Sequence, residues 1–156
     1  MAVTHVRYAA PGWGVGELVV DGNRLLLHEL PSPGRGDSSR GSHELAGRFR
    51  RYFAGEPLSF DDVELALDGA TDFTRALTAA LRAVPRGEVV TYGELAALAG
   101  RRGAHRAAGT FCAQNAFGLV VPCHRVVAAA GLGGYGALGA AYKRRLLSLE
   151  GVHVAG

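Results

Sequence analysis

Apolar residues form short alternating runs in the first part of the chain, a pattern that predicts β-strands rather than helices. The runs cover Val3 to Tyr8, Val15 to Val20 and Leu25 to Leu30. Pro11-Gly12 separates the first two runs, and Asp21-Gly22-Asn23 separates the last two. Because Asp-Gly sequences favour tight turns between strands, we expect a hairpin at the second break.

The pattern changes after these runs. Pro31 to Gly41 is rich in Gly, Ser, Pro and Arg, and we expect a mobile loop there. The next apolar residues recur at helical spacing and are followed by two helix breakers: Leu45, Phe49, Tyr52 and Phe53, then Gly55 and Pro57. Val63 to Leu67 predicts one more strand.

Helical spacing dominates the second part of the chain. Phe73, Leu77, Leu81 and Val84 share one helical face, and Pro85 ends that predicted helix. Thr91 and Glu94 are spaced as a capping box, which predicts the start of a second helix over residues 92–99. Residues 100–103 read as a tight basic turn, and residues 104–114 as a third helix.

Two short helices joined by a glycine-containing turn match a helix-turn-helix, although helix corners in proteins that do not bind DNA look the same. The second of these helices has a surface of small residues, Ala104, Ala107, Ala108 and Gly109, from which Arg106 projects. Such a helix could enter a minor groove closely. The alternative is a helix packed against a neighbour, with Arg106 in solvent.

The length of 156 residues fits one compact unit or two small subdomains. We expect an N-terminal α/β subdomain with a β-sheet over residues 1–68. A mostly helical C-terminal domain, resembling a winged helix, is expected over residues 69–156. The fold class is therefore α+β. Hydrophobic residues make up 48% of the chain, which is enough for a sizeable core.

Net charge and targeting signals say less about function than the residue pattern does. The formal charge of +3 and the sequence pI near 9.2 permit binding to nucleic acid without requiring it. No apolar run approaches the roughly 20 residues of a membrane span, and the N-terminus lacks a signal-peptide pattern. We therefore expect a cytoplasmic protein that does not bind membranes.

The two cysteines, Cys112 and Cys123, are too few for a disulfide scaffold and are not spaced as a zinc or redox pair. Cys123 stands next to His124, which invites an interpretation as nucleophile and base. Adjacent side chains seldom face each other, so this pair would need a turn or a bridging water. A third group would have to orient His124, and Glu150 is the candidate. The alternative is a buried cysteine that serves only packing.

The wider sequence resembles the O6-alkylguanine-DNA alkyltransferases, also called methylated-DNA–protein-cysteine methyltransferases. The resemblance is dense from Asp72 to Gly151 and faint before it. The elements that carry it occur in the family's order: Thr91 to Ala96, Arg106 to Gly109, Asn115, Pro122 to Val127, Gly133 to Gly136, and Lys143 to Gly151. This family repairs DNA by moving an alkyl group onto a cysteine of the protein itself.

The resemblance implies a catalytic role for five residues. Cys123 would accept the alkyl group, once per molecule, and His124 would act as its base through a water. Glu150 would orient His124. Together these side chains and the water would lower the pKa of the Cys123 thiol from about 8.5. Tyr92 would donate to N3 of the damaged base, and Asn115 would brace the turn that exposes Cys123. Asn115 could instead cap the preceding helix in a left-handed conformation.

The resemblance also implies how DNA and the base are held. The partner would be double-stranded DNA carrying O6-alkylguanine, and O4-alkylthymine as a further substrate. The duplex would be bound through its minor groove by a monomer that needs no cofactor. Arg106 would fill the gap left by the flipped nucleotide. Further DNA contacts are expected from Thr91, Tyr92, Ala107, Ala108 and Gly109. The substrate pocket would include Tyr135 as a wall, the Gly136 amide and the carbonyls of Cys123 and Val126. Arg125 is expected to be structural.

Several positions depart from the family pattern. Ala116 stands where members often have proline after the asparagine, His105 precedes Arg106, and the loop around Tyr135 is altered and about one residue shorter. Cys112 lies near the expected pocket at helical spacing from Arg106. We expect it to line the alkyl pocket, where it could form a disulfide with Cys123 or act as a second acceptor; the alternative is an inert thiol. No Cys/His set in the first part predicts a zinc ion, and no metal is expected.

Three other classes of protein remain as alternatives. A non-catalytic alkyl-lesion-binding protein would lack the acceptor cysteine, which is present here. A transcription regulator would use the helix-turn-helix in a major groove, but the small helix surface and the lack of an evident dimerisation helix disfavour it. A cysteine hydrolase would need a further histidine placed by a motif, and none is evident.

Overall fold

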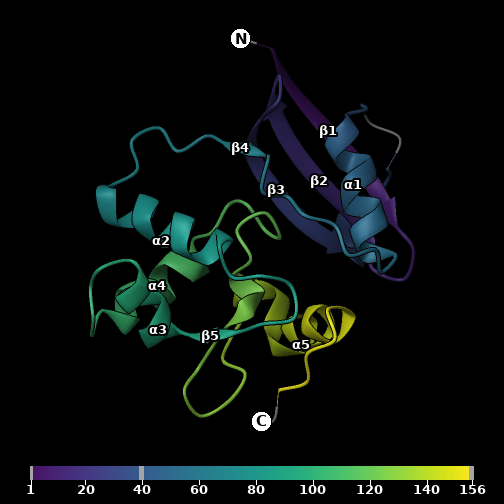
Figure 1. Ribbon diagram of the computed structural model, residues 1–156. Coiled ribbons are helices and arrows are strands. Elements are labelled where there is room, and N and C mark those ends of the chain that lie inside the picture. Colours follow the sequence, from purple (N-terminus) through teal and green to yellow (C-terminus); the bar gives the residue numbers. More distant parts are fainter. Residues whose placement is uncertain (1, 39–40, 155–156) are drawn as a thin grey trace. The chain divides into compact units, whose positions relative to one another are not determined.

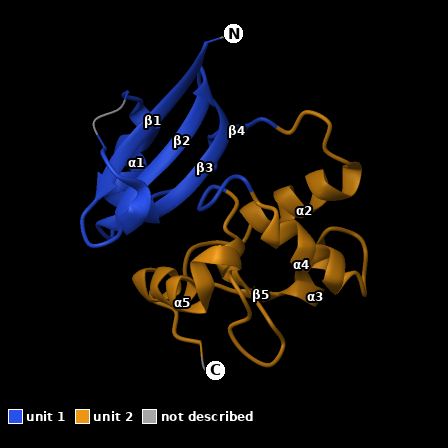
Figure 2. Cartoon of the chain, turned by 180° about the vertical axis from the view of Figure 1, so that it is seen from behind, with its two compact units in different colours: residues 1–66, 116–120 blue, residues 67–115, 121–156 orange. Residues whose placement is uncertain are grey.

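The computed structural model describes residues 2–38 and 41–154 and divides the chain into two compact units. The first comprises residues 1–66 together with 116–120, and the second comprises residues 67–115 and 121–156 (Figure 2). The chain therefore leaves the first unit, builds half of the second, and returns to the first for five residues before completing the second. Nothing in the hydrophobic pattern indicated this return.

The first unit is built on a four-stranded sheet in the order β1-β2-β3-β4. Its strands are β1 (Val3–Ala10), β2 (Gly14–Asp21), β3 (Arg24–Ser32) and β4 (Glu64–Leu65). The first three are antiparallel, and β4 runs parallel to β3. The predicted hairpin is confirmed: Asp21 pairs with Arg24, and Gly22 has the positive φ of 60° that tight hairpin turns require.

Helix α1 (Glu44–Phe53) packs against this sheet (Figure 1). His43 caps it, because the His43 side chain accepts a hydrogen bond from the Leu45 amide. The helix buries the apolar residues predicted for its face and ends before Gly55, which has a φ of 103°. In the expected loop, Pro33–Arg35 forms a 3-10 turn, and residues 39–40 of that loop lie outside the described residues.

Aromatic rings fill the core between α1 and the sheet. The Phe49 ring stacks on His28 at 3.7 Å between centroids with an interplanar angle of 1°, and Tyr8 lies 5.7 Å from Phe49. Gly16 faces Tyr8 across the β1–β2 pair, and a Cβ there would lie 2.3 Å from the Tyr8 ring. This glycine therefore provides the space in which the tyrosine packs.

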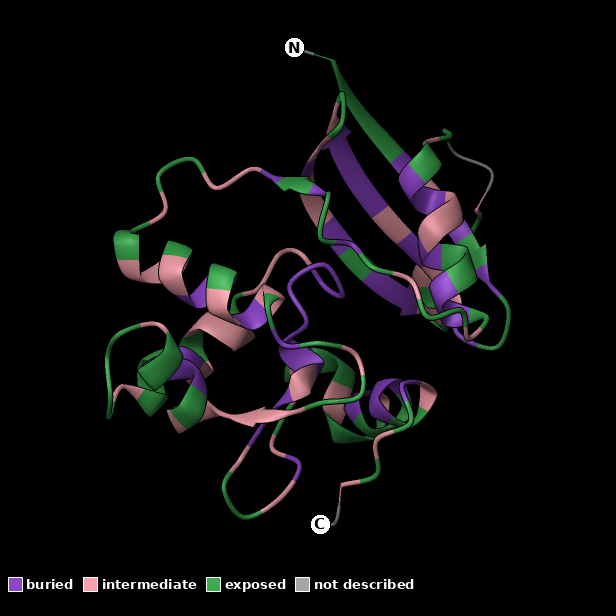
Figure 3. Cartoon of the chain, in the orientation of Figure 1, coloured by how far each residue is buried: buried purple, intermediate pink, exposed green. Residues whose placement is uncertain are grey.

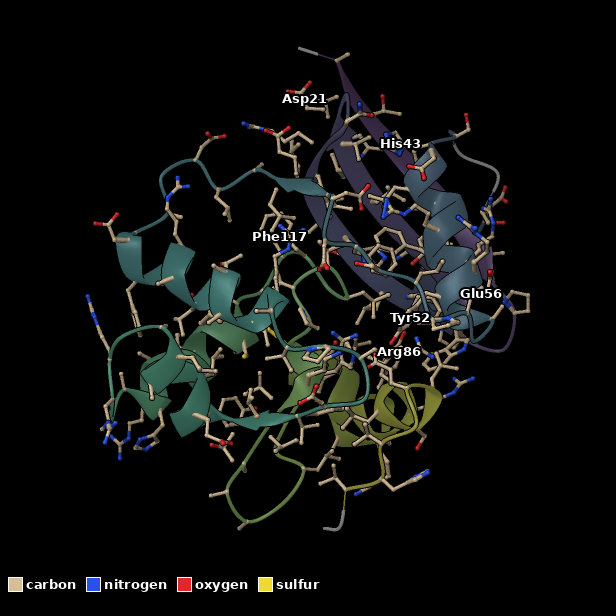
Figure 4. The ribbon with its side chains drawn as sticks, in the orientation of Figure 1. Asp21, His43, Tyr52, Glu56, Arg86 and Phe117 are labelled. Carbon is tan, nitrogen blue, oxygen red and sulfur yellow. The ribbon has the colours of Figure 1, made fainter. Side chains whose placement is uncertain are left out.

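The returning segment is held by both the backbone and the ring of His28. The His28 amide donates to the Ala116 carbonyl at 2.8 Å, and a β-bridge joins His28 to Phe117, which is labelled in Figure 4. His28 Nδ1 lies 2.7 Å from the Gly118 carbonyl, and Nε2 lies 2.6 Å from the Tyr8 hydroxyl. Burial lowers the pKa of His28 to about 4, so the ring is neutral at pH 7.

The second unit is mostly helical. Its helices are α2 (Asp72–Arg82), α3 (Tyr92–Leu98), α4 (His105–Ala113) and α5 (Gly139–Leu149). Two short parallel strands, β5 (Val90–Thr91) and β6 (Val126–Val127), pair beside them. Buried positions gather on the inward faces of α2 and α5, whereas the tip where α3 meets α4 is largely exposed (Figure 3).

Side-chain caps fix where the helices of this unit begin. Thr71 accepts a hydrogen bond from the Thr74 amide at the start of α2. The capping box predicted at α3 is confirmed: Thr91 Oγ1 accepts from the Glu94 amide, and Glu94 Oε1 accepts from the Thr91 amide. Helices α3 and α4 pack against each other across the turn at residues 99–104. Within the described residues, no helix is long and apolar enough to cross a membrane.

Candidate active site

Cys123 begins a 3-10 turn, Cys123–Arg125, that follows a buried apolar run. The Cys123 amide donates to the Val121 carbonyl at 2.8 Å, and Asn115 Nδ2 donates to the same carbonyl at 2.8 Å. Asn115 thus ties the end of α4 to the reactive turn, as a brace would. It does not take the left-handed conformation of a helix cap, because Leu119 is the one non-glycine residue with a positive φ in the described part of the chain.

His124 and Arg125, the last two residues of the reactive turn, form a buried charge chain with Glu150, the residue just after α5. His124 Nε2 lies 2.8 Å from Glu150 Oε2, and both side chains are inaccessible to solvent. Arg125 grips the same carboxylate at 2.9 and 3.0 Å and also donates to the Val84 carbonyl at 2.7 Å. Arg125 therefore joins the end of α5 to Val84, two positions after α2, in agreement with its predicted structural role.

The contacts of Glu150 and His124 determine their protonation states. Burial by itself would raise the pKa of Glu150, but the hydrogen bonds and charges of His124 and Arg125 hold it well below its usual range. Glu150 is therefore a carboxylate at neutral pH. Burial lowers the pKa of His124, against the opposing effect of Glu150, so this ring is neutral. Because a carboxylate only accepts hydrogen bonds, the proton of neutral His124 lies on Nε2.

The other ring nitrogen, His124 Nδ1, is then an acceptor. It is buried and has no hydrogen-bond partner among the described residues. A buried acceptor left unpaired costs about 1–3 kcal/mol. An unpartnered basic nitrogen on the residue next to a buried thiol is the arrangement expected of a base that works through a small bridging molecule.

Cys112, on α4, shares a hydrogen bond with the Cys123 thiol. Burial raises the pKa of Cys123 well above its usual value, and the hydrogen bond and charge of Cys112 raise it further, against the opposing effects of Asn115 and Lys143. The predicted lowering of the Cys123 pKa is therefore wrong in this structure, because burial outweighs the favourable contacts. The hydrogen bond from Cys123 instead lowers the pKa of Cys112. The two thiols lie together, as expected for Cys112.

Lys143 is a further member of this site that the residue pattern did not predict. It is fully buried, donates to the Gly134 carbonyl at 3.1 Å, and places its ammonium 5.7 Å from the centroid of the Tyr92 ring. Its charge lowers the pKa of both thiols. Lys143 and Glu150 are seven positions apart on the helix face that buries Leu146 and Leu147, and this spacing was the available signal.

The residues expected around the substrate differ in how far they are buried. Burial raises the pKa of the Tyr92 and Tyr135 hydroxyls, and the nearby thiols add to this effect. Val126 is buried in β6, while Gly136 is exposed at the start of a 3-10 turn, Gly136–Leu138. Because their pKa values are raised, the hydroxyls of Tyr92 and Tyr135 are protonated at neutral pH and able to donate a hydrogen bond.

The residues expected to contact DNA are less uniform than the sequence suggested. Arg106 and Ala107 are exposed on α4, and Gly109 is partly buried. Ala108 is fully buried, so its expected place on the DNA-facing surface is wrong: it faces the core of the second unit. The Thr91 hydroxyl is engaged in the capping box. No group of three or more His, Cys, Asp or Glu suited to a metal ion occurs in the described ranges.

A buried thiol beside a histidine, a carboxylate and a lysine defines a cysteine-centred group-transfer site, and comparison with known proteins gives the same class. The family model described as "6-O-methylguanine DNA methyltransferase, DNA binding domain" matches residues 72–152. The methylated-DNA–protein-cysteine methyltransferase of Methanopyrus kandleri is 41% identical over 127 residues, which cover 79% of this chain and 94% of that protein. Its counterpart from Mycobacterium tuberculosis is 44% identical over 124 residues, covering 79% and 70%.

Solved structures agree. Mycobacterium tuberculosis OGT in complex with DNA matches with a TM-score of 0.79 at 37% identity, covering 94% of this chain and 92% of that one. The O6-methylguanine-DNA methyltransferase of Pyrococcus kodakaraensis matches with a TM-score of 0.73 at 26% identity, covering 97% and 100%. The chain belongs to the methylated-DNA–protein-cysteine methyltransferase family, as its motifs predicted. The α+β fold class is likewise confirmed.

Proposed function

We propose that this protein repairs DNA by transferring the alkyl group of O6-alkylguanine to Cys123, irreversibly and once per molecule. The observation that carries the proposal is the buried pair in which Glu150 fixes His124 through Nε2, while Nδ1 of His124, the residue next to the acceptor cysteine, is buried and has no hydrogen-bond partner among the described residues. The reaction breaks the bond between O6 and the alkyl carbon and forms a thioether at Cys123. Since water does not cleave a thioether, the product is a spent protein.

The proton path follows from the tautomer of His124. A water between Cys123 and Nδ1 would accept the thiol proton and pass its own proton to Nδ1, while Nε2 keeps its bond to Glu150. The imidazolium that results is stabilised by the adjacent carboxylate. Lys143, whose charge already favours both thiolates, stabilises the sulfur anion as it forms. These effects act against the burial that raises the pKa of Cys123.

The leaving base is guanine, which needs a proton or a hydrogen bond to stabilise its developing negative charge. We propose that the Tyr92 hydroxyl donates to N3 and that the Gly136 amide donates to O6. The carbonyls of Cys123 and Val126 accept from the exocyclic amine, and Tyr135 forms a wall of the pocket. The O4 atom of O4-alkylthymine presents the same bond to the same thiol, so we propose it as a second substrate.

We propose that α3 and α4 act as a helix-turn-helix that enters the minor groove of double-stranded DNA. Exposed Arg106 and Ala107 on α4 support this orientation, because a slim helix surface allows close approach and a guanidinium can replace a flipped nucleotide. Flipping a base costs a few kcal/mol, and an alkylated guanine that pairs poorly costs least. The protein would act as a monomer, in the cytoplasm with its substrate DNA.

The decisive experiment is a single-turnover reaction with duplex DNA that contains one O6-methylguanine, followed by intact-mass analysis and peptide mapping. The expected result is one methyl group per protein, on Cys123, with a plateau at one equivalent and no transfer to Cys123→Ser. A parallel duplex with O4-methylthymine tests the second substrate. Binding without transfer would support the alternative, a non-catalytic lesion-binding protein. A methyl group on Cys112 would make it a second acceptor.

The role of Arg106 is tested with Arg102→Ala as a matched control, because both arginines are exposed and stand four positions apart. We expect Arg106→Ala to slow transfer from duplex DNA while leaving transfer from free O6-benzylguanine unchanged, since the free base needs no flipping. Arg102→Ala is expected to weaken binding and reduce the salt dependence by about one phosphate contact. Equal effects of both substitutions on transfer from duplex DNA would refute a flipping role.

A further inference from the structure

The second unit contains one pair of thiols that the proposed transfer reaction does not need as a pair. Cys112 and Cys123 are the only cysteines of the chain, and each is the other's hydrogen-bond partner. They come from different elements, α4 and the 3-10 turn Cys123–Arg125, and are eleven positions apart in sequence. A loop of that length closes at a low entropic cost. Asn115 joins the two elements: its amide donates to the Cys112 carbonyl at 3.3 Å, and its side chain donates at 2.8 Å to the Val121 carbonyl, which also accepts from the Cys123 amide. The two thiols are therefore held near each other before any reaction.

We propose that Cys112 and Cys123 form a reversible disulfide with hydrogen peroxide as the oxidant, which closes the acceptor to alkyl transfer and protects it from irreversible oxidation. The disulfide itself depends only on the two thiols. Its consequence for repair rests on the proposed function of Cys123. In a reducing cytoplasm such a bond is transient, which is what a redox-sensing site requires.

The geometry also assigns an order to the steps. Cys112 is partly exposed whereas Cys123 is buried, so peroxide reaches Cys112 first. The hydrogen bond from Cys123 and the charge of Lys143 both favour the Cys112 thiolate. That thiolate attacks one peroxide oxygen, forming a sulfenic acid at Cys112 and releasing hydroxide. Peroxide has then accepted two electrons from a single sulfur.

The second step forms the bond. Once Cys112 is a neutral sulfenic acid, its negative charge no longer opposes ionisation of Cys123. The Cys123 thiol loses its proton and its sulfur attacks Cys112, so that the S–S bond forms and hydroxide leaves, which the released proton converts to water. In total, two thiols and one peroxide give one disulfide and two waters. The alkyl acceptor itself never carries the sulfenic acid that further peroxide would oxidise irreversibly.

The proposal is tested on the full chain with wild type, Cys112→Ser and Cys123→Ser. Each protein is treated with a small excess of hydrogen peroxide, alkylated, and analysed by non-reducing peptide mapping. We expect a Cys112–Cys123 crosslinked peptide in wild type that disappears with dithiothreitol. Cys123→Ser should accumulate a sulfenic acid at Cys112 that dimedone traps. Free Cys112 in wild-type molecules whose Cys123 is oxidised would overturn the proposal.

Transfer activity provides a second measurement, normalised to each protein's own untreated value. Wild type should lose transfer after peroxide and regain it fully with dithiothreitol. Cys112→Ser should lose transfer without full recovery, because its Cys123 oxidises beyond the reversible stage. Equal recovery in both would overturn the protective role. If untreated proteins transfer no methyl group, the proposed function fails, while the peptide map still decides whether the disulfide forms.

Discussion

Acidification should destabilise the first unit through His28, and the size of the effect follows from its pKa. In the neutral ring, Nδ1 donates to the Gly118 carbonyl and Nε2 accepts from the Tyr8 hydroxyl. Protonation would make Nε2 a donor, so that the Tyr8 hydroxyl would have to turn and accept from it, and would leave a buried charge stacked on Phe49. A pKa lowered from 6.5 to about 4 corresponds to about 3 kcal/mol of stability at neutral pH.

This stability is present above the pKa of the unfolded chain and is lost as the pH falls toward 4, because the unfolded chain binds the additional proton in that window. Between about pH 7 and about pH 5 the expected loss is about 2 kcal/mol from His28 alone. The assay is guanidinium unfolding at both pH values, followed by the fluorescence of Trp13. This residue is the only tryptophan, and it is buried against Phe53 in the same unit.

His28→Gln is the control, because glutamine keeps a donor and an acceptor but does not titrate in this range. The variant should be less stable than wild type at neutral pH, yet it should lose about 2 kcal/mol less between the two pH values. His124 also has a lowered pKa but is present in both proteins, so its contribution cancels. Equal losses in the two proteins would refute the assignment of the pH dependence to His28.

Three further substitutions test the second unit. Glu150→Gln breaks a buried ion pair, so we expect a loss of about 3–5 kcal/mol in chemical denaturation, together with slower methyl transfer; unchanged stability would contradict the charge chain. Thr91→Ala removes half of the capping box and should cost about 1 kcal/mol, measured by thermal unfolding; an unchanged Tm would contradict the role of the cap. Lys143→Met keeps the bulk but removes the charge that favours the Cys123 thiolate, so iodoacetamide should modify Cys123 more slowly at fixed pH. An unchanged rate would show that the charge of Lys143 does not act on this thiol.

Features encoded within a few residues were predictable from the sequence. The hairpin at Asp21, the capping box at Thr91 and the end of α1 before Gly55 each depend on local backbone preferences. The contacts of Glu150 with His124 and Arg125 were not predictable in this way. Local chemistry named Glu150 only as a candidate, because glutamate is usually exposed and nothing nearby indicated that Arg125 would grip it. Its position came from the resemblance to a family.

The features that the sequence did not predict also have physical reasons. A helix made of small residues has no clear apolar stripe, so the inward orientation of Ala108 could not be read from periodicity. Lys143 was overlooked because lysine is rarely buried. The partnership of His28 with Gly118 joins residues 90 positions apart, and no local pattern contains such a contact. The pKa of Cys123 depends on burial, which only the folded chain defines.

The return of residues 116–120 to the first unit has a consequence for synthesis on the ribosome. Domains generally fold as units, N-terminal first, while the chain is still growing. Here β3 cannot acquire the backbone partners of His28 until Ala116 and Phe117 have been made, by which time α2, α3 and α4 have already been synthesised. The His28 amide therefore lacks its acceptor, the Ala116 carbonyl, until about half of the second unit has been synthesised. Maturation of the first unit and emergence of the reactive turn are thus tied to nearly the same moment of translation.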